Sequence, residues 1–431
     1  MALPENFLIG AATAAHQAEG NNIHSDCWAL ENIKHSDYLE KSGAAVDHYN
    51  RYEEDIRLMA GAGLNAYRFT IEWARIEPEE GKFDDSEIEH YRAVLRCCRD
   101  NGIEPIVTLH HFSSPVWLIR KGGWEAETTP DDFARYVEYV MTKLGPELSY
   151  ICTINEANMG LQIAAIAKRY MKDMLRNGRK KKKNTDGQVQ MGMNLETVLK
   201  NMALAGQEKL EAVGTKDPKG FQTMRTKKGD ELIMKAHVKA RAVIRRLAPH
   251  AKVGLTLSLH DVQPVPGGEK QAEKIWNDEF THYLPYLRED DFLGVQNYTR
   301  CIIGRSGDLG VPQGARTTQM AYEYYPEALG HVIERTAKDF KGDILVTENG
   351  IATEDDAERC EFIRRAMMSV EKCIEKGIPV KGYIHWTLMD NFEWQKGFSM
   401  RFGLIAVDRT DMSRHPKESL ALLGTYAKKK D

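Results

Sequence analysis

Short apolar runs alternate with amphipathic helical patterns eight times along this chain of 431 residues. Apolar runs of roughly four to eight residues, rich in β-branched side chains, are typical of buried strands. Apolar residues recur at helical spacing between them, as in Tyr49–Ala62, Ser86–Asn101, Pro130–Leu144, Asp230–Leu247 and Glu354–Lys376. Eight such alternations favour a closed parallel barrel over an open, doubly wound sheet. The expected strands are 7–12, 65–71, 104–110, 150–155, 252–259, 292–297, 343–348 and 380–386.

The spacing of these runs also bounds the domain organisation. No glycine-rich phosphate-binding fingerprint follows the first run, which disfavours a dinucleotide-binding sheet. We therefore predict an α/β fold, a single (β/α)8 TIM barrel over residues 1–431 with elaborated loops at the carboxyl-end face. The stretch around 157–235 is too long for an ordinary connection and contains helix-like segments at Ile163–Leu175 and Leu195–Val213. We expect it to lie over the barrel mouth without a core of its own.

The composition argues against several classes of function. A net charge of −4 gives no general attraction to nucleic acid or anionic membranes, and we expect neither as a partner. The basic run at 179–183 lies among Asn and Gly and is typical of a solvated loop. No apolar run reaches the roughly 18 residues that a membrane span requires. The amino-terminal residues show no secretory signal, and the seven cysteines are scattered, so we expect a cytoplasmic protein with reduced thiols.

The sequence shows no metal-binding pattern. The cysteines lack the paired spacing of a zinc site, and the adjacent His110 and His111 have no carboxylate at ligand spacing. We therefore expect neither a metal nor another cofactor. The oligomeric state stays open, and a homo-oligomer is compatible with the sequence.

Polar and aromatic residues follow the expected strands at one end. Glu156 follows the fourth run, Glu348 ends the seventh and Trp386 ends the eighth. The carboxyl ends of the strands carry the functional loops in an α/β barrel, so periodicity alone places these residues on one rim. The same rim is expected to hold Gln17 after the first run, Arg68 in the second, His111 after the third and Tyr298 after the sixth.

The segment 382–394 combines two indoles, Trp386 and Trp394, with the carboxylate of Glu393. Indoles offer flat apolar faces for a sugar ring, and a carboxylate accepts hydrogen bonds from neighbouring hydroxyls. A charge that is removed from water needs a partner, so a purely structural strand end has little reason to carry this composition. The segment therefore predicts a sugar-binding pocket.

Three further motifs accompany this segment. They are Phe7–Gly20, Thr153-Ile154-Asn155-Glu156 and Val346-Thr347-Glu348-Asn349-Gly350. In their order and spacing, the four motifs resemble glycoside hydrolase family 1, the retaining β-glycosidases. The resemblance runs from about residue 7 to 416, with a poorly matching stretch near 157–235.

The resemblance implies roles for the two glutamates. Glycoside hydrolysis needs a proton donor for the leaving oxygen, and retaining enzymes add a second carboxylate, about 5–5.5 Å away, that attacks the anomeric carbon. By resemblance, Glu156 is the acid/base and Glu348 is the nucleophile. The acid needs a raised pKa, whereas the nucleophile needs hydrogen-bond donors and positive charge. Arg68 and Tyr298 match the family's positions for that support.

The resemblance also implies a glycone pocket. Gln17, His111, Asn155 and Glu393 match the positions that bind sugar hydroxyls, and Tyr298 belongs to the same substrate-binding set. Trp386 matches the stacking floor beneath the sugar, and Trp394 matches the indole that bonds a ring hydroxyl.

Several positions depart from the family pattern. Ala157 replaces the usual Pro after the acid/base, Gln296 replaces an Asn, and His16 replaces a common Tyr. The residues after the His111 region are Ser113-Ser114-Pro115 rather than Asp-Leu-Pro. These changes bear mainly on the aglycone side and leave the natural aglycone open.

We expect a β-glucosidase that hydrolyses terminal non-reducing β-D-glucosyl residues of small glucosides or oligosaccharides by double displacement. The alternative is a 6-phospho-β-glucosidase, for which Lys396 and Arg401 offer positive charge. Against it, Trp394 keeps the indole and Phe398 stands where the phosphate-binding set has Tyr. A third reading, a non-catalytic glycoside-binding barrel, is disfavoured because both glutamates are present.

Overall fold

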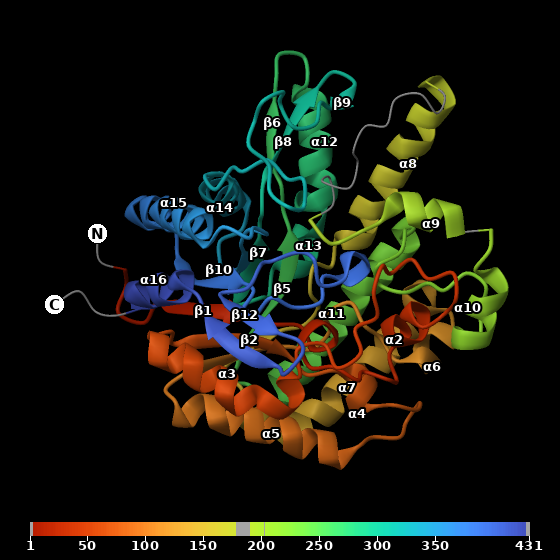
Figure 1. Ribbon diagram of the computed structural model, residues 1–431, viewed down its shortest axis with the longest axis vertical. Coiled ribbons are helices and arrows are strands. Elements are labelled where there is room, and N and C mark those ends of the chain that lie inside the picture. Colours follow the sequence, from red (N-terminus) through yellow and green to blue (C-terminus); the bar gives the residue numbers. More distant parts are fainter. Residues whose placement is uncertain (1–2, 178–189, 202, 428–431) are drawn as a thin grey trace.

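A closed barrel of eight parallel strands forms the centre of the computed structural model, which describes residues 3–177, 190–201 and 203–427 (Figure 1). The strands follow one another in the order β1-β11-β10-β7-β5-β4-β3-β2, and β1 pairs with both β2 and β11. The predicted barrel and all eight expected strands are confirmed. The barrel strands are β1 (Leu8–Ala12), β2 (Ala66–Thr70), β3 (Glu104–Thr108), β4 (Tyr150–Cys152), β5 (Lys252–Ser258), β7 (Phe292–Gln296), β10 (Asp343–Asn349) and β11 (Val380–Trp386).

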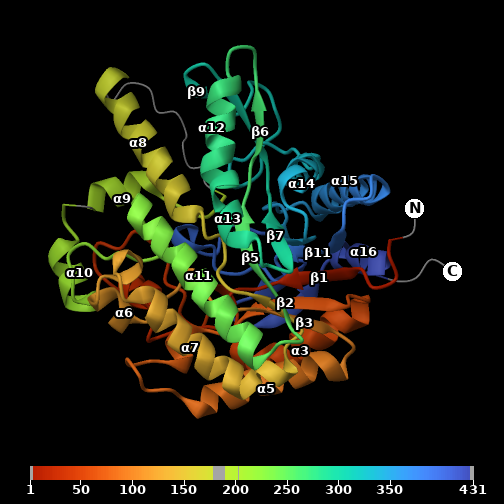
Figure 2. The ribbon, with the colours of Figure 1, turned by 180° about the vertical axis from the view of Figure 1, so that it is seen from behind.

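The long helices surround the barrel (Figures 1 and 2). Their ends follow local chemistry: the carboxylates of Asp84 and Asp355 accept hydrogen bonds from the first turns of α5 and α15. Helix α3 stops at Gly63, whose φ of 99° suits a residue without a side chain. These helices are α3 (His48–Ala62), α5 (Asp85–Asp100), α7 (Thr129–Leu144), α11 (Lys227–Leu247), α14 (Ala328–Asp339), α15 (Asp356–Glu375) and α16 (Glu418–Ala427).

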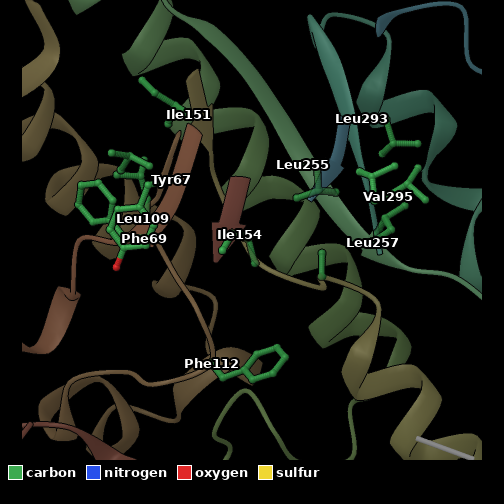
Figure 3. Close-up of a cluster of buried hydrophobic side chains, with 14 of the residues drawn as sticks. Tyr67, Phe69, Leu109, Phe112, Ile151, Ile154, Leu255, Leu257, Leu293 and Val295 are labelled. Carbon is green, nitrogen blue, oxygen red and sulfur yellow. The ribbon is translucent and has the colours of Figure 1, made fainter. Parts of the chain in front are cut away.

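Alternate side chains of the barrel strands, with the exception of β5, enter two different apolar clusters. Tyr67, Phe69, Leu255 and Val295 point outward into the core beneath the helices (Figure 3). Ala66 lies in the second cluster and shares its face of β2 with Arg68, so this second cluster fills the barrel interior. The interior side chains therefore lead directly to the polar residues at the carboxyl ends of the strands.

Two excursions project from the same end of the molecule (Figures 1 and 2). One is α8 (Met159–Asn177), and the other is a small sheet of β6 (Asp261–Pro264), β8 (Arg300–Gly304) and β9 (Gly307–Asp308) beside α12 (Glu269–Glu279). The short helices nearer the barrel are α1 (Ala15–Ala18), α2 (Asp26–Glu31), α4 (Trp73–Ile76), α6 (Val116–Arg120), α9 (Leu195–Asn201), α10 (Gly206–Val213) and α13 (Leu284–Leu287).

The helix-like segment Leu195–Val213 forms two helices, α9 and α10, with a break between them. The side chain of Asn201 donates to the carbonyl of Ser36 at 2.8 Å, which holds the end of α9 against the loop before α3. Gly206, a poor helix former, begins α10. Tertiary hydrogen bonding and local propensity therefore divide one helical pattern.

The stretch around 157–235 shares the main hydrophobic core. Met159, Ile163, Met191, Met193 and Phe221 belong to the same buried cluster as the outward side chains of the barrel strands. The basic run at 179–183 lies outside the described residues. Within the described parts of the chain, no helix is both long and apolar enough to cross a bilayer.

A hairpin of β12 (Ile405–Asp408) and β13 (Ser413–Pro416) holds the loop after β11 in place. The Leu388 amide donates to the carbonyl of Ala12 in β1, and Ile405 exchanges backbone hydrogen bonds with Leu388 and Asp390. The hairpin is fixed to α3 by Arg414, which donates to both carboxylate oxygens of buried Asp55 at 2.8 and 2.9 Å. The loop that carries Glu393 therefore rests on a rigid support.

We predict that Asp55→Ala lowers the free energy of unfolding by about 3–5 kcal/mol, because it leaves the buried Arg414 cation without its carboxylate. Glu54→Ala is the matched control, since Glu54 is 46% exposed and pairs with Arg51 at the surface. Its effect should stay below about 1 kcal/mol. Urea unfolding of both variants measures the difference, and equal losses would contradict the assigned role of the Asp55–Arg414 pair.

Candidate active site

The carboxyl ends of β2, β4 and β10 meet at the guanidinium of Arg68. Its Nη1 donates to Glu348 Oε1 at 2.6 Å, and its Nη2 donates to Asn155 Oδ1 at 2.5 Å. All three side chains are buried. Residues that are far apart in the sequence are thus brought together as the periodicity of the strands predicts.

Glu348 is surrounded by hydrogen-bond donors. Besides Arg68, Gln296 Nε2 donates to Oε1 at 2.9 Å and the Tyr298 hydroxyl donates to Oε2 at 2.6 Å. Burial raises the pKa of Glu348, but Arg68, Tyr298 and Gln296 each lower it by favouring the carboxylate. Oε1 therefore has two donors, whereas Oε2 has one and keeps a lone pair for another partner.

Glu156 lies in a different environment on the turn after β4. Its amide donates to Thr256 Oγ1 at 3.0 Å, and Arg225 holds the next carbonyl, that of Ala157, at 2.9 Å. Its buried Oε1 has no hydrogen-bond partner among the described residues. Burial raises the pKa of Glu156 well above its ordinary value, and the charge of Glu348 raises it further.

The two glutamates therefore differ in how readily each holds a proton. Both side chains are buried, and two neighbouring buried carboxylates cannot both ionise at low cost. Glu348 has a guanidinium and two further donors, while a hydrogen bond from Ser258 and the charge of Arg68 oppose the rise in the pKa of Glu156. These environments favour the proton on Glu156 over Glu348, so the pair can supply an acid and an ionised carboxylate at one location.

Glu393 and Gln17 form a second polar group. Gln17 Nε2 donates to Glu393 Oε2 at 3.2 Å and to the carbonyl of Phe392 at 2.7 Å, and both side chains are buried. Burial raises the pKa of Glu393 to about 7, against the lowering effect of the hydrogen bond from the Gly192 amide. Glu393 thus accepts hydrogen bonds as a carboxylate only near neutral pH and above.

His111 is a neutral donor in the same site. Burial and the nearby Arg68 lower its pKa well below the ordinary value. The Asn155 amide nitrogen lies 3.1 Å from Nε2. Because Asn155 Oδ1 already accepts from Arg68 and Gln296, its nitrogen donates and the single ring proton lies on Nδ1. That buried Nδ1, like Gln17 Oε1, has no partner within the described chain.

Aromatic rings line these polar groups. The rings of His111 and Trp386 lie 5.6 Å apart with planes 28° from parallel. Trp394 stacks on His16 at 5.7 Å, so the His that replaces the family's usual Tyr supports an indole of the site. These rings give the site flat apolar surfaces beside unsatisfied donors and acceptors, which suits a sugar.

Three non-glycine residues in the left-handed region lie at this site. Phe112 has φ 71°, Glu156 has φ 44° and Trp394 has φ 46°. Each lies at or next to a residue named above, and such backbone strain is concentrated at functional sites. The surrounding hydrogen bonds hold the chain in these conformations so that the side chains reach the centre.

The structure brings all ten sequence-predicted site residues into one connected set. They are Gln17, Arg68, His111, Asn155, Glu156, Tyr298, Glu348, Trp386, Glu393 and Trp394. The sequence analysis missed Thr256, which bonds both Asn155 and the Glu156 amide, and also Gln190 and Gly192. Thr256 could have been predicted from its inward position in an alternating strand. Gln190 and Gly192 follow a polar stretch without any periodic pattern, which gives no such indication.

The fold and the paired carboxylates are those of a barrel glycoside hydrolase. The model of the family described as glycosyl hydrolase family 1 matches residues 1–189 and 308–431. The chain belongs to this family. The unmatched part, 190–307, begins later and extends further than the stretch near 157–235 that departs from the family's motifs.

Known relatives agree with this assignment. The chain is 26% identical to β-glucosidase A of Thermotoga maritima, with 96% of this chain and 95% of the relative covered. It is 27% identical to a 6-phospho-β-galactosidase of Staphylococcus aureus, with 97% and 96% covered. A crystal structure of the β-glycosidase BGL167 is 43% identical over 99% of this chain and 97% of that one, with a TM-score of 0.85.

We predict a bell-shaped dependence of kcat/KM on pH for an aryl β-glucoside. Activity should rise with pH as Glu348 and Glu393 ionise and fall as Glu156 loses its proton, at a pH well above the ordinary pKa of a glutamate. In Glu156→Gln, assayed with a dinitrophenyl glucoside that needs no proton donor, the alkaline fall should disappear. An unchanged alkaline fall in that variant would assign it to another group.

Proposed function

We propose that the protein is a retaining β-glucosidase that releases terminal β-D-glucosyl residues from small glucosides or oligosaccharides. The observation that carries the proposal is the unequal environment of the two buried carboxylates. One is ionised by three donors, and the other holds a proton beside an unpartnered oxygen. The β-glucosidase among the relatives supports the choice of glucoside.

The geometry supports a double displacement. Glu348 Oε2, which keeps a free lone pair, attacks the anomeric carbon while the bond from that carbon to the leaving oxygen breaks. Glu156 gives its proton to the leaving oxygen and becomes a carboxylate. Glu156 then takes a proton from water as the water oxygen attacks the anomeric carbon, and the sugar leaves Glu348 with retained configuration.

The remaining site residues hold the sugar in this proposal. Glu393, Gln17, His111 and Asn155 bind its hydroxyls, and the indoles of Trp386 and Trp394 lie against its apolar surface. Interactions with sugar hydroxyls strengthen toward the transition state, so this pocket contributes to the rate as well as to affinity. We further propose a single domain in a reducing, cytoplasmic compartment, which the shared core and seven free thiols support.

Replacing Glu348 with Gly should abolish turnover, because no covalent intermediate can form. Azide, which fits the space left by the carboxylate, should restore activity and give the α-glucosyl azide, the product of a single inversion. Nuclear magnetic resonance of the product measures the configuration. Rates near those of the wild type without azide would contradict the assignment of the nucleophile.

Replacing Glu156 with Ala should lower kcat/KM for glucosides with poor leaving groups by roughly 10²–10⁴-fold. Dinitrophenyl glucoside should lose far less in its first step, because the leaving phenolate needs no proton. Added azide should yield β-glucosyl azide, since attack on the glucosyl–enzyme needs no base. A uniform loss over all leaving groups without rescue would show that Glu156 is not the acid/base.

A 6-phospho-β-glycosidase is the second candidate, favoured by the 27% identity to a 6-phospho-β-galactosidase. The site opposes it, because a phosphate on O6 adds about 1.5–2 negative charges beside the buried Glu393 carboxylate. Ser399 and Arg401, which follow the Trp394 turn, instead line a surface cavity of about 830 Å³ with Asp408 and His415. The cation of Arg401 thus lines that cavity.

We therefore predict that 6-phosphorylation of a nitrophenyl β-glucoside lowers kcat/KM by orders of magnitude, since a dianion would be desolvated against a like charge. The two substrates are compared at one pH and ionic strength. A wild-type preference for the phosphorylated substrate would overturn the glucosidase assignment in favour of the second candidate.

A further inference from the structure

A segment outside the family match crosses the site. Residues Gln190–Asn194, here called the strap, are buried. The Gly192 amide donates to Glu393 Oε1 at 2.9 Å, and the Gly192 carbonyl accepts from the Gln395 amide at 3.1 Å. Asn194 bonds Gln395 twice, through its amide at 2.7 Å and its side chain at 2.5 Å. The strap is therefore bound along the turn that carries Glu393 and Trp394.

The strap completes the orientation of the Glu393 carboxylate. A carboxylate offers about four acceptor positions, two on each oxygen. Gln17 takes one on Oε2 and the Gly192 amide takes one on Oε1. One position on each oxygen remains, which is the number that two neighbouring hydroxyls of one sugar require. Without the hydrogen bond from the Gly192 amide, the Gln17 hydrogen bond alone would leave the carboxylate free to rotate.

Position 192 accepts only glycine in this arrangement. A Cβ built there would lie 2.4 Å from the Glu393 carbonyl oxygen and 3.0 Å from Glu393 Oε1. Both distances are shorter than ordinary contacts, and the first involves backbone that cannot turn away. Close approach of two backbones is a recognised reason for a glycine. Here the approach brings an amide donor to a carboxylate of the site.

The strap also reaches the catalytic pair. Gln190 Oε1 accepts from the Tyr298 amide at 2.7 Å, and Gln190 Nε2 donates to Ser258 Oγ at 3.0 Å. Tyr298 bonds Glu348, and the Ser258 hydroxyl bonds Glu156. One short segment is therefore connected to the residues around both glutamates and to Glu393.

We infer that Gly192 is a positioning residue that fixes Glu393 for a glycone bearing both O4 and O6 hydroxyls, and that the strap thereby sets glycone specificity. The inference rests on the proposed glycosidase function. Glu393 with both oxygens oriented binds a glucoside through two hydroxyls. A xyloside lacks the O6 group and uses only one of the two free acceptor positions. The strap thus favours glucoside over xyloside.

The test compares Gly192→Ala with wild type on nitrophenyl β-glucoside and β-xyloside. A misaligned charged acceptor should lower kcat/KM for the glucoside by roughly 10- to 100-fold. The xyloside should lose less, so the glucoside-to-xyloside ratio of kcat/KM falls. Gly206→Ala in α10 is the matched control, because a Cβ there meets nothing within 4 Å and the ratio should stay at the wild-type value.

A second readout separates positioning from damage to the fold. The Gly192 amide lowers the pKa of Glu393, so its displacement should raise that pKa and move the acidic fall of glucoside kcat/KM to higher pH. If Gly192→Ala melts early, Asn194→Ala decides instead, because it removes only the side-chain bond to Gln395. It should shift the ratio in the same direction by a smaller factor.

The outcomes distinguish the two proposals. A wild type inactive on every β-glycoside would overturn the proposed function itself. An active wild type whose folded Gly192→Ala variant keeps both the ratio and the pH profile would overturn only the role of the strap. For a Gly192→Ala variant that does not fold, an unchanged ratio in Asn194→Ala has the same meaning.

Discussion

The hydrogen-bonded pair of Arg68 and Glu348 is the interaction on which the rest of the site depends. A buried guanidinium is costly unless its donors are satisfied, and Arg68 satisfies them with Glu348, Asn155, Thr108 and the Thr347 carbonyl. Arg68 lies in β2, and its partners belong to β3, β10 and the turn after β4. Barrel closure is what brings the four together, because neighbouring parallel strands end on the same rim. The fold thus offsets the cost of a buried cation, and the cation in turn keeps one buried carboxylate ionised.

The sequence predicted those parts of the structure that follow a regular spacing of apolar residues or a known motif. Alternation of apolar residues located the eight strands, and the ends of those strands located Glu156, Glu348 and Trp386. The family resemblance added the hydroxyl-binding roles of Gln17 and Glu393, which their positions after a strand do not reveal. Thr256 could also have been predicted, because it points inward from a strand of known register. The division of Leu195–Val213 into α9 and α10 could not have been predicted, because it depends on a hydrogen bond from Asn201 to a loop far away in the chain.

Gly192 and Gln190 show why the remaining part of the site resisted prediction. Their roles come from contacts with Glu393, Tyr298 and Ser258, which are each more than 60 residues away in sequence. A backbone amide donates regardless of residue type, so no side-chain pattern reveals it. The glycine is required only because another backbone lies within 2.4 Å of its missing Cβ. Both residues lie in the stretch 190–307, which the family model does not match.

The balance of charge in the site connects these observations to the kind of substrate. Three buried carboxylates, Glu156, Glu348 and Glu393, share the site with the cation of Arg68, and the charges of Glu348 and Glu393 each raise the pKa of Glu156. The first proton resides on Glu156, while Glu393 has a pKa of about 7 and depends on Gly192 and Gln17 to remain a carboxylate. Arg68 and Glu348 then cancel, and the remaining charge of the site lies between zero and −1. Such a site favours an uncharged glycoside, whose hydroxyls donate to Glu393. As its glycosidic bond breaks, the anomeric carbon gains positive charge beside Glu348, and this excess of negative charge stabilises it.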